Sequence, residues 1–188
     1  ADTGKAVVAS IDPLTYALLH MDDTGLTDDA GHTVVKSGSL ARSATQSKFG
    51  GYSAYYSAAG PTDQITLTPG TTLTGDFTAE GWVYPTGSTS GMGFIFGSEA
   101  AGRIAFYFTS ARLPIHNVYG SGNVSYGSTP LSLNTWTHVA FVRSGTTITC
   151  YLNGTAVGSN TLAGTLGNAT NFRMDGGGGT SYHDEVRI

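Results

Sequence analysis

The sequence predicts an all-β protein folded as a two-layer antiparallel sandwich. Three observations lead to this prediction: short runs of alternating apolar and polar residues, turn residues between these runs, and no convincing helical periodicity. The 188 residues include 27 glycines, and only 12% of the chain is charged, which is about half the usual share. The length suits one domain with a substantial core.

The apolar runs place the expected strands along the chain. These strands are predicted at residues 16–21, 33–36, 53–57, 64–68, 76–84, 93–97, 103–108, 114–118, 123–126, 136–143, 146–152, 155–158, 172–174 and 182–188. Turns are expected at 69–70, 85–87 and 144–145, and at Asn153 with Gly154, because these residues fix φ or adopt positive φ. Residues 1–13 have no clear period and are predicted to be an N-terminal arm or linker before a domain at 14–188.

Two of the expected strands are apolar on both sides. In 76–84, one face carries Phe77, Ala79, Gly81 and Val83, and the other carries Thr78, Glu80, Trp82 and Tyr84. The strand at 136–143 has the same character. Both strands are therefore predicted to be central, with loops or the rim of the second sheet covering part of the outer face.

The charge pattern argues against two classes of partner. The net charge is -4 and no cluster of Lys and Arg occurs, so we expect no nucleic-acid partner. No apolar run approaches the roughly 18 to 20 residues of a membrane span, and residues 1–10 do not resemble a signal peptide. We therefore expect no membrane insertion, and a soluble, excised or processed module.

The single Cys150 alternates with Ile148 and Leu152 and is predicted to be a buried, structural thiol.

Several stretches, in a fixed order, carry a family resemblance. They are Leu18-Leu-His-Met-Asp22, Gln46-Ser-Lys-Phe-Gly-Gly51, Asp76-Phe-Thr-Ala-Glu-Gly-Trp-Val83, Asn134-Thr-Trp-Thr-His-Val-Ala-Phe-Val-Arg143, Ile148-Thr-Cys-Tyr-Leu-Asn-Gly-Thr-Ala-Val157 and His183-Asp-Glu-Val-Arg-Ile188. Together they resemble the laminin G-like jelly roll of the concanavalin A-like lectin and glucanase superfamily. The resemblance implies a jelly roll whose first and last strands lie side by side. It does not fix the ligand, since members bind sugars or proteins, cleave glycans, or serve as structural modules.

The same resemblance implies a calcium site between the first and last strands. Carried over to this chain, its ligands are Asp22 and Asp184, with main-chain oxygens of residues 46–51 assisting. The ion would be structural. The alternative, that Asp22 and Asp184 are ordinary solvated acids at strand ends, stays open, and Asp28 with Asp29 is interpreted as a polar turn.

A sugar-binding surface is predicted within residues 103–126. Sugars bind when an aromatic ring packs on the pyranose and polar groups bond its hydroxyls. The segment offers that mixture in Arg103, Tyr107, Arg112, His116, Tyr119 and Tyr126, together with Asn117 and Asn123. The alternative is that Tyr107 packs at the edge of the sandwich while Phe106 and Phe108 face the core.

Catalysis is not favoured by the sequence. The glucanase string Glu-x-Asp-x-x-Glu is absent, and the neighbours Asp184 and Glu185 are expected to point to opposite faces of a strand. The histidines lack the spacing of a zinc site. The glycine run 176–179 is interpreted as a flexible loop, since it lacks the lysine of a phosphate loop.

The leading hypothesis is a non-catalytic carbohydrate-binding module, stabilised by calcium, within a larger extracellular, cell-surface or virion protein. Its partner would be a glycan or surface polysaccharide. The alternative is a structural or protein-interaction module, such as a phage head or tail decoration or adhesion domain, which would contact other protein subunits. A glycan hydrolase or lyase that pairs Glu80 with another acid ranks last.

Overall fold

The structure is a computed structural model in which residues 11–23, 26–57, 63–98, 100–167 and 170–188 are described. Every strand in it belongs to one of two antiparallel sheets, and no helix occurs among the described residues. The predicted all-β sandwich is therefore confirmed. Nor does this part of the chain contain a helix long and apolar enough to cross a membrane. Residues 1–10 of the predicted arm lie outside the described residues.

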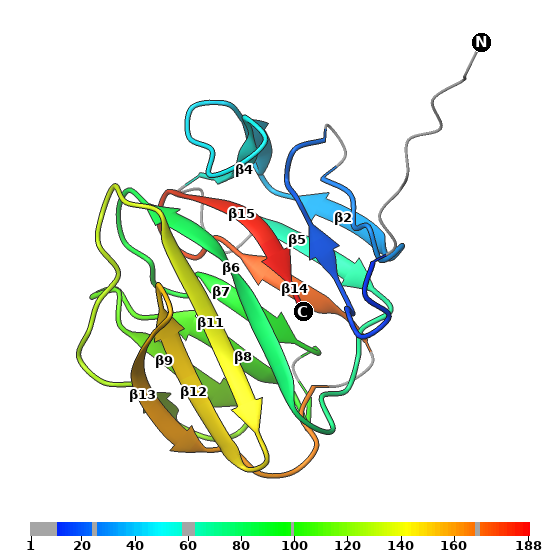
Figure 1. Cartoon of the computed structure of the whole chain (residues 1–188), viewed down its shortest axis with the longest axis vertical. Helices are drawn as coiled ribbons and strands as arrows, with labels where there is room; N and C mark the ends of the chain where they lie inside the picture. Colours follow the sequence, from blue (N-terminus) through cyan, green and yellow to red (C-terminus); the bar gives the residue numbers. More distant parts are fainter. Residues whose placement is uncertain (1–10, 24–25, 58–62, 99, 168–169) are drawn as a thin grey trace.

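Sheet A contains eight strands. They are β1 (Leu18–Leu19), β3 (Ala41–Ser43), β4 (Ser53–Tyr56), β6 (Phe77–Pro85), β11 (Thr137–Ser144), β12 (Thr147–Leu152), β13 (Thr155–Thr161) and β15 (Ser181–Arg187). Their order is β13-β12-β11-β6-β15-β4-β3, and β1 pairs with the far end of β15. Leu18 lies opposite Arg187, so the first and last strands are neighbours, as the family resemblance implied. Figure 1 shows β15 in red beside β6.

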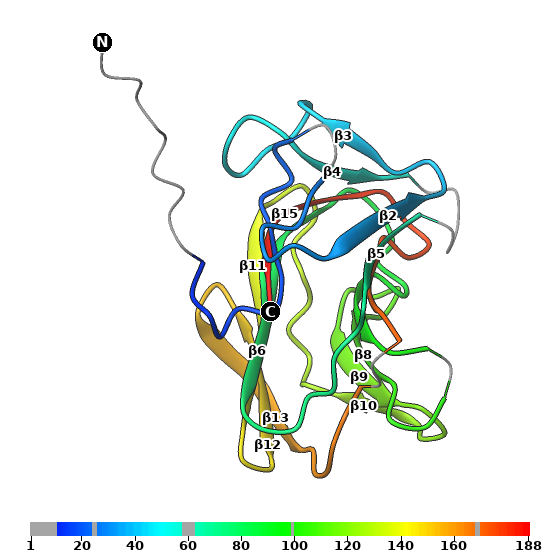
Figure 2. The same ribbon diagram turned by 90° about the vertical axis from the view of Figure 1, so that its right-hand side faces the viewer.

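Sheet B contains seven strands. They are β2 (Thr33–Ser37), β5 (Gln64–Thr68), β7 (Gly93–Phe96), β8 (Ile104–Phe108), β9 (Pro114–Val118), β10 (Asn123–Ser125) and β14 (Phe172–Asp175). Their order is β10-β9-β8-β7-β14-β5-β2. Figure 2 views the sandwich nearly edge-on, with β6 and β11 in one layer and β5, β8 and β9 in the other.

Aromatic side chains fill the space between the sheets. Phe106 of β8 stacks on Phe141 of β11 with ring centroids 4.8 Å apart, and this contact joins the two layers. Both rings are fully buried, and so is Cys150. The predicted buried thiol is therefore confirmed, and burial raises the pKa of Cys150 to about 12.

The strand prediction is close to the observed elements. β13 extends to Thr161 instead of residue 158, and two larger differences concern β1 and β3. β3 was not predicted, and β1 is much shorter than the expected 16–21, because Met21 has a positive φ of 64° that interrupts the extended chain. The predicted turn between β12 and β13 is present, with φ of 49° at Asn153 and 77° at Gly154.

The glycine run 176–179 differs from its sequence interpretation. The backbone of this run packs directly against the backbone of Ser88 to Ser90. A Cβ on Gly177 would lie 2.3 Å from Ser90 O, and a Cβ on Gly179 would lie 1.5 Å from Ser88 O. Gly178 N–H also donates a hydrogen bond of 2.8 Å to Ser90 O. The glycines are needed because two backbones touch here, so the prediction of a flexible loop was wrong.

Candidate functional site

The outer face of sheet A is built by alternate residues of its central strands. In β6, Ala79 and Val83 are buried in the core, whereas Glu80 and Trp82 are part-exposed on the other side. Trp82 lies opposite His138 of β11, and Glu80 lies opposite Ala140. The two faces predicted for β6 are therefore observed, and Trp82, Glu80 and His138 share the outer one.

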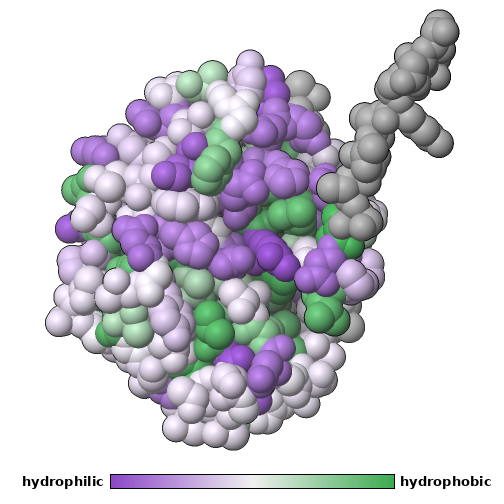
Figure 3. Space-filling model, in the orientation of Figure 1, coloured by the Kyte–Doolittle hydropathy of each residue, from purple (hydrophilic) through white to green (hydrophobic). Residues whose placement is uncertain are grey.

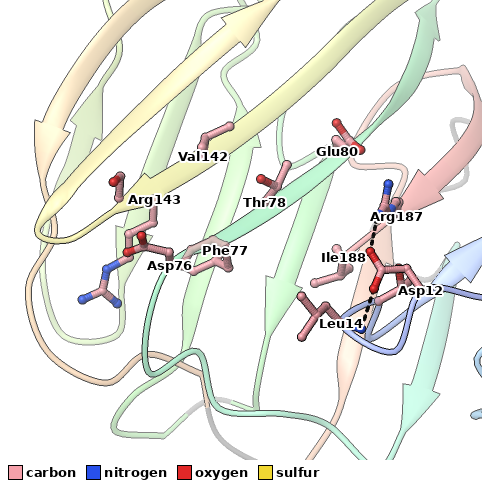
Figure 4. Close-up of a pocket in the computed structure, with 12 residues that line it drawn as sticks. Asp12, Leu14, Asp76, Phe77, Thr78, Glu80, Val142, Arg143, Arg187 and Ile188 are labelled. Atoms are coloured by element: carbon pink, nitrogen blue, oxygen red, sulfur yellow. Dashed lines mark hydrogen bonds and ion pairs between the residues drawn. The ribbon is translucent and has the colours of Figure 1, made fainter.

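Two adjoining hollows form a groove along this face, which we call the sheet A groove. Their volumes are about 580 and 410 Å³, and Glu80 and Arg187 line both of them. Figure 4 shows the larger hollow, with Arg187 between Glu80 and Asp12. Figure 3 shows the same face, where hydrophilic residues form a band across the middle and hydrophobic residues lie beside it. The groove therefore combines apolar and charged walls.

Trp82 is the centre of the aromatic end of the groove. Phe49 meets it edge-on with ring centroids 6.0 Å apart, and His138 lies 5.3 Å away on the neighbouring strand. Lys48 places its Nζ 4.1 Å from the centroid of the Trp82 ring. The loop before β4 thus brings two side chains against one tryptophan, which confirms that a loop covers part of this face.

A row of aromatic rings continues across the same face beyond Trp82. Tyr55 lies 5.0 Å from Tyr182, Tyr182 lies 5.9 Å from Tyr84, and Tyr84 lies 5.5 Å from Trp136, all between ring centroids. Tyr55, Tyr182 and Tyr84 are direct cross-strand partners in β4, β15 and β6. Strand pairing, rather than a loop, therefore fixes their spacing.

Charged groups in and beside the groove form pairs. Glu80 lies 3.5 Å from His138 Nε2, and Glu185 Oε1 lies 2.8 Å from His20 Nδ1. His20 also lies 3.3 Å from Asp29. The hydrogen bond to Glu185 raises the pKa of His20 above its usual value, and the charge of Asp29 adds to this against the opposing effect of burial.

Glu185 is on the outer face because β15 contains a bulge. The register against β6 shifts between Asp184 and Arg187, and Glu185 has a positive φ of 48°. Asp184 lies opposite Trp82, while Glu185 lines the groove beside the same ring. The expectation that Asp184 and Glu185 point to opposite faces was wrong, because the bulge removes the simple alternation.

Asp184 lies beneath the loop that contains Lys48 and Phe49. Its side chain is fully buried, and its Oδ2 accepts hydrogen bonds from the amides of Lys48, at 2.8 Å, and Phe49, at 3.0 Å. Its Oδ1 is buried and has no hydrogen-bond partner among the described residues. Burial raises the pKa of Asp184 to about 6, and these two amide bonds only partly counteract it.

Asp22 contacts the same loop at Gly50. A Cβ on Gly50 would lie 1.8 Å from Asp22 Oδ2, so the carboxylate rests directly on the glycine backbone. Asp22 Oδ1 is also buried without a hydrogen-bond partner in the described part of the chain, and its charge contributes to the raised pKa of Asp184. The structure therefore brings together the two carboxylates and the 46–51 loop named from the family resemblance.

This acidic site suits a hard cation with mixed ligands. Within the described ranges, no group of three or more His, Cys, Asp or Glu side chains is placed to hold a metal. Calcium commonly combines carboxylates with main-chain carbonyls, and two uncompensated carboxylate oxygens beside a backbone loop fit that preference. Asp22 and Asp184 could hold such an ion with loop carbonyls. A site made only of side chains is not formed.

Two of the six predicted sugar-binding residues are inside the sandwich. His116 is 3% exposed and Tyr126 is 1% exposed. His116 packs between Tyr126, at 5.4 Å, and Phe106, at 6.3 Å, measured between ring centroids. They cannot contact a ligand at the surface, so this part of the prediction was wrong. Burial lowers the pKa of His116, and no charged group among the described residues offsets this effect.

Arg112 and Tyr119 lie at loop positions away from both hollows of the groove. Arg112 has a positive φ of 67° and donates from Nε to Leu131 O at 2.8 Å, so it supports a loop. Tyr119 follows β9 and is 46% exposed. Neither residue lines a described pocket together with Arg103 or Tyr107.

Arg103 and Tyr107 do come together, on the outer face of sheet B. They line a pocket of about 350 Å³ with Asp175 of β14. Tyr107 donates its hydroxyl hydrogen to Asn123 Oδ1 at 2.7 Å. The sequence missed Asp175, which is distant in the chain and reaches this pocket only through sheet pairing.

The sheet A groove was also missed by the sequence reasoning, although part of its signal was present. The alternation in 76–84 placed Glu80, Trp82 and Tyr84 on one face, but loops or a sheet rim were expected to cover part of that face, and no binding site was predicted there. Glu185 and Arg187 could not be assigned to it without knowing the bulge. Phe49 reaches the groove from a loop whose position no periodicity predicts.

Comparison with known proteins identifies the family. Residues 59–187 match the model of a laminin G-type family described as the concanavalin A-like lectin/glucanases superfamily. The chain belongs to this superfamily. The resemblance drawn from the sequence is thereby confirmed. No curated protein matches the chain.

Three solved structures share the fold of this chain at low sequence identity. Domain 4 of AbnA, a GH43 extracellular arabinanase from Geobacillus stearothermophilus solved with arabinotriose, is 19% identical, with a TM-score of 0.68 over 92% of this chain and 90% of that one. The carbohydrate-binding module CBM66 from Bacillus subtilis is 12% identical, with a TM-score of 0.52 over 81% and 92%. Botulinum neurotoxin type C is 11% identical, with a TM-score of 0.66 over 92% of this chain and 47% of that one. At these identities the likeness concerns the fold, which carbohydrate-binding modules share.

Proposed function

We propose that this domain is a non-catalytic carbohydrate-binding module and that a glycan chain lies in the sheet A groove. The observation that carries the proposal is the position of Trp82 in the groove wall, flanked by Phe49 and His138 and next to Glu80 and Arg187. An aromatic ring beside carboxylate and guanidinium groups suits a sugar, which has an apolar face and hydroxyl groups that need hydrogen-bond partners.

In the proposed complex, an apolar ring contacts the sugar ring and charged side chains form hydrogen bonds with its hydroxyl groups. The Trp82 ring would pack against the apolar face of one sugar unit, where its burial excludes water. Glu80 and Glu185 would accept hydrogen bonds from hydroxyl groups, and Arg187 would donate to them. Because their histidine and acidic partners already orient these side chains, little conformational entropy is lost on binding.

The shape of the groove favours a chain over a single sugar. Its two hollows share Glu80 and Arg187 and follow one another along the face. The aromatic row of Tyr182, Tyr84 and Trp136 extends the same face further. A polysaccharide could therefore contact several units, each contributing a modest affinity, as expected of a module that keeps a larger protein near its glycan.

Calcium is the cofactor that we propose for the acidic site. Asp22 and Asp184 would hold it with main-chain oxygens of residues 46–51, and the ion would satisfy the buried Oδ1 atom of each carboxylate. Its role would be structural, since it would fix the loop that carries Lys48 and Phe49. The domain would serve as part of a larger extracellular, cell-surface or virion protein, where calcium is abundant enough to occupy a weak site.

Glycan arrays followed by calorimetry test the proposal, with Trp82→Ala as the main variant. We expect wild-type protein to bind a polysaccharide and Trp82→Ala to lose roughly 30-fold in affinity, which is about 2 kcal/mol. Tyr151→Ala is the matched control, because Tyr151 lies opposite Ala140 in β12 and does not line the groove. Its affinity should equal that of wild type.

Two outcomes would overturn the proposal. If folded wild-type protein binds no glycan with or without calcium, the protein-interaction alternative is favoured instead. If incubation with the bound glycan releases reducing ends or unsaturated products, and Glu80→Gln abolishes that release, the domain is an enzyme.

A further inference from the structure

A second pocket lies on the opposite side of the sandwich, in the outer face of sheet B. Its volume is about 350 Å³, near the lower end of the range of roughly 300 to 1,000 Å³ for small-molecule sites. Its lining includes Arg103, Tyr107 and Asp175, together with the small residues Ala105 and Gly177. The two sheets and the core between them separate this pocket from the sheet A groove.

Glycine residues, which have no side chains, leave the space between the polar walls of the pocket. Gly93 of β7 pairs with Asp175 on one side and Tyr107 on the other, so a residue without a side chain separates them. A Cβ on Gly93 would lie 2.0 Å from Phe106 O, and therefore no other residue fits there without backbone movement. Gly177 closes one rim, held against the backbone around Ser90 as described above. Backbone packing at Gly93 and Gly177 therefore fixes part of the wall of the pocket.

Asp175 is the unsatisfied group of this pocket. Its Oδ1 is buried and accepts no hydrogen bond from the described residues. Burial raises the pKa of Asp175 to about 6, while the nearby charges of Arg173 and Arg103 act in the opposite direction. A buried carboxylate oxygen without a donor costs free energy, which a ligand hydroxyl would recover.

The mixture of charges around Asp175 selects the chemistry of the ligand. An anionic ligand would meet the Asp175 carboxylate, and a cationic ligand would meet Arg103 and Arg173. A neutral molecule with neighbouring hydroxyls satisfies both, because one hydroxyl can donate to Asp175 while the next accepts from Arg103. Tyr107 has already donated its hydroxyl hydrogen to Asn123, so it offers an acceptor oxygen and an aromatic ring.

We propose that this pocket binds a single neutral sugar unit, either free or at the end of a glycan, through a pair of neighbouring hydroxyls. Asp175 accepts from one hydroxyl, Arg103 donates to the other, and Tyr107 packs against the ring. The inference goes beyond the proposed function and does not depend on the sheet A groove. If both hold, the domain carries two sugar sites on opposite faces, one for a chain and one for a single unit.

Titration of wild-type protein with neutral monosaccharides and disaccharides, followed by amide NMR, tests the proposal. We expect shifts at the amides of Gly93, Gly177 and Gly178, with a dissociation constant in the millimolar range typical of weak sites, about 4 kcal/mol. Asp175→Asn preserves shape but removes the charge, and should weaken binding about tenfold or more. Ala105→Leu places a larger apolar side chain in the pocket without altering its charge, and should also abolish the shifts.

The Trp82→Ala variant separates this proposal from the previous one. It should retain the monosaccharide shifts, whereas Asp175→Asn should retain polysaccharide binding in the sheet A groove. The inference is overturned if no neutral sugar at millimolar concentration shifts the pocket amides, if Asp175→Asn binds as wild type, or if the only shifts occur around Trp82. Circular dichroism of each variant ensures that lost binding is not lost folding.

Discussion

Phe49 donates its amide hydrogen to Asp184 Oδ2 over 3.0 Å, and its ring meets Trp82 edge-on at 6.0 Å. One residue therefore touches both the acidic site and the aromatic centre of the sheet A groove. Lys48 makes the same two contacts: its amide donates a hydrogen bond to Asp184 Oδ2, and its Nζ lies 4.1 Å from the centroid of the Trp82 ring. The position of Asp184 thus determines how the loop covers Trp82.

The first prediction follows from this connection and concerns calcium. Removing the ion should leave two uncompensated carboxylates under the loop, loosen Lys48 and Phe49, and weaken glycan binding at Trp82. We expect a chelator to lower the glycan affinity of wild type several-fold. In Asp184→Asn, calcium affinity should fall by about tenfold or more, and the chelator should have no further effect on glycan binding. Calorimetry with Ca²⁺ and with glycan measures both.

Asp23→Asn is the control for this prediction. Asp23 is next to Asp22 in sequence, but its carboxylate accepts from the Thr27 amide at 3.0 Å and not from the 46–51 loop. Its calcium and glycan affinities should match those of wild type. Calcium binding by Asp184→Asn with unchanged affinity would show that the calcium site lies elsewhere.

The second prediction concerns the pH dependence of calcium stabilisation. Without metal, the pKa of Asp184 is raised to about 6 in the folded state from the usual 3.8, so the folded state binds this proton more tightly than the unfolded state. Its contribution to stability is therefore greatest below the unfolded value and is lost as pH rises through about 6. Calcium binds the deprotonated carboxylate. The difference in melting temperature between calcium and chelator should thus be larger at pH 7.5 than at pH 5, measured by differential scanning fluorimetry.

Much of the fold could be predicted because strands leave a strong local pattern. Trp82 and Val83 fall on opposite faces of β6 as alternation requires, and the Asn153 and Gly154 turn has the positive φ values that these residues suggest. The meeting of Asp22 and Asp184 at one loop followed from the family resemblance, not from spacing.

The sites could be predicted only in part, because they depend on register and on irregular backbone. In β9, Ile115 looks more suited to the core than His116, yet pairing with Phe106 of β8 directs His116 inward. The bulge at Glu185 changes the face of one groove residue, and no local signal marks it. Asp175 joins the sheet B pocket through the pairing of distant strands.

The third prediction concerns acid stability and His183. Its side chain is fully buried beside Tyr56, and burial lowers its pKa to about 3. The unfolded state, with a pKa near 6.5, binds the proton more readily, so stability from this group is lost as pH falls below about 6.5. Between pH 6.5 and 5 the loss should be about 2 kcal/mol. Urea unfolding should show a shallower pH slope for His183→Gln than for wild type, whatever their absolute stabilities; equal slopes would contradict this assignment.

The last prediction uses His116, which the sequence placed in the sugar-binding surface and the structure places in the core. Its Nδ1 is buried and has no hydrogen-bond partner among the described residues, and its ring is surrounded by Phe106 and Tyr126. His116→Phe keeps a ring of similar shape and removes the unsatisfied Nδ1. The free energy of unfolding should stay the same or rise by about 1 kcal/mol, and glycan binding at both faces should be unchanged. If His116→Phe folds but has reduced sugar affinity, the core placement of His116 is contradicted and the residue belongs to the binding surface.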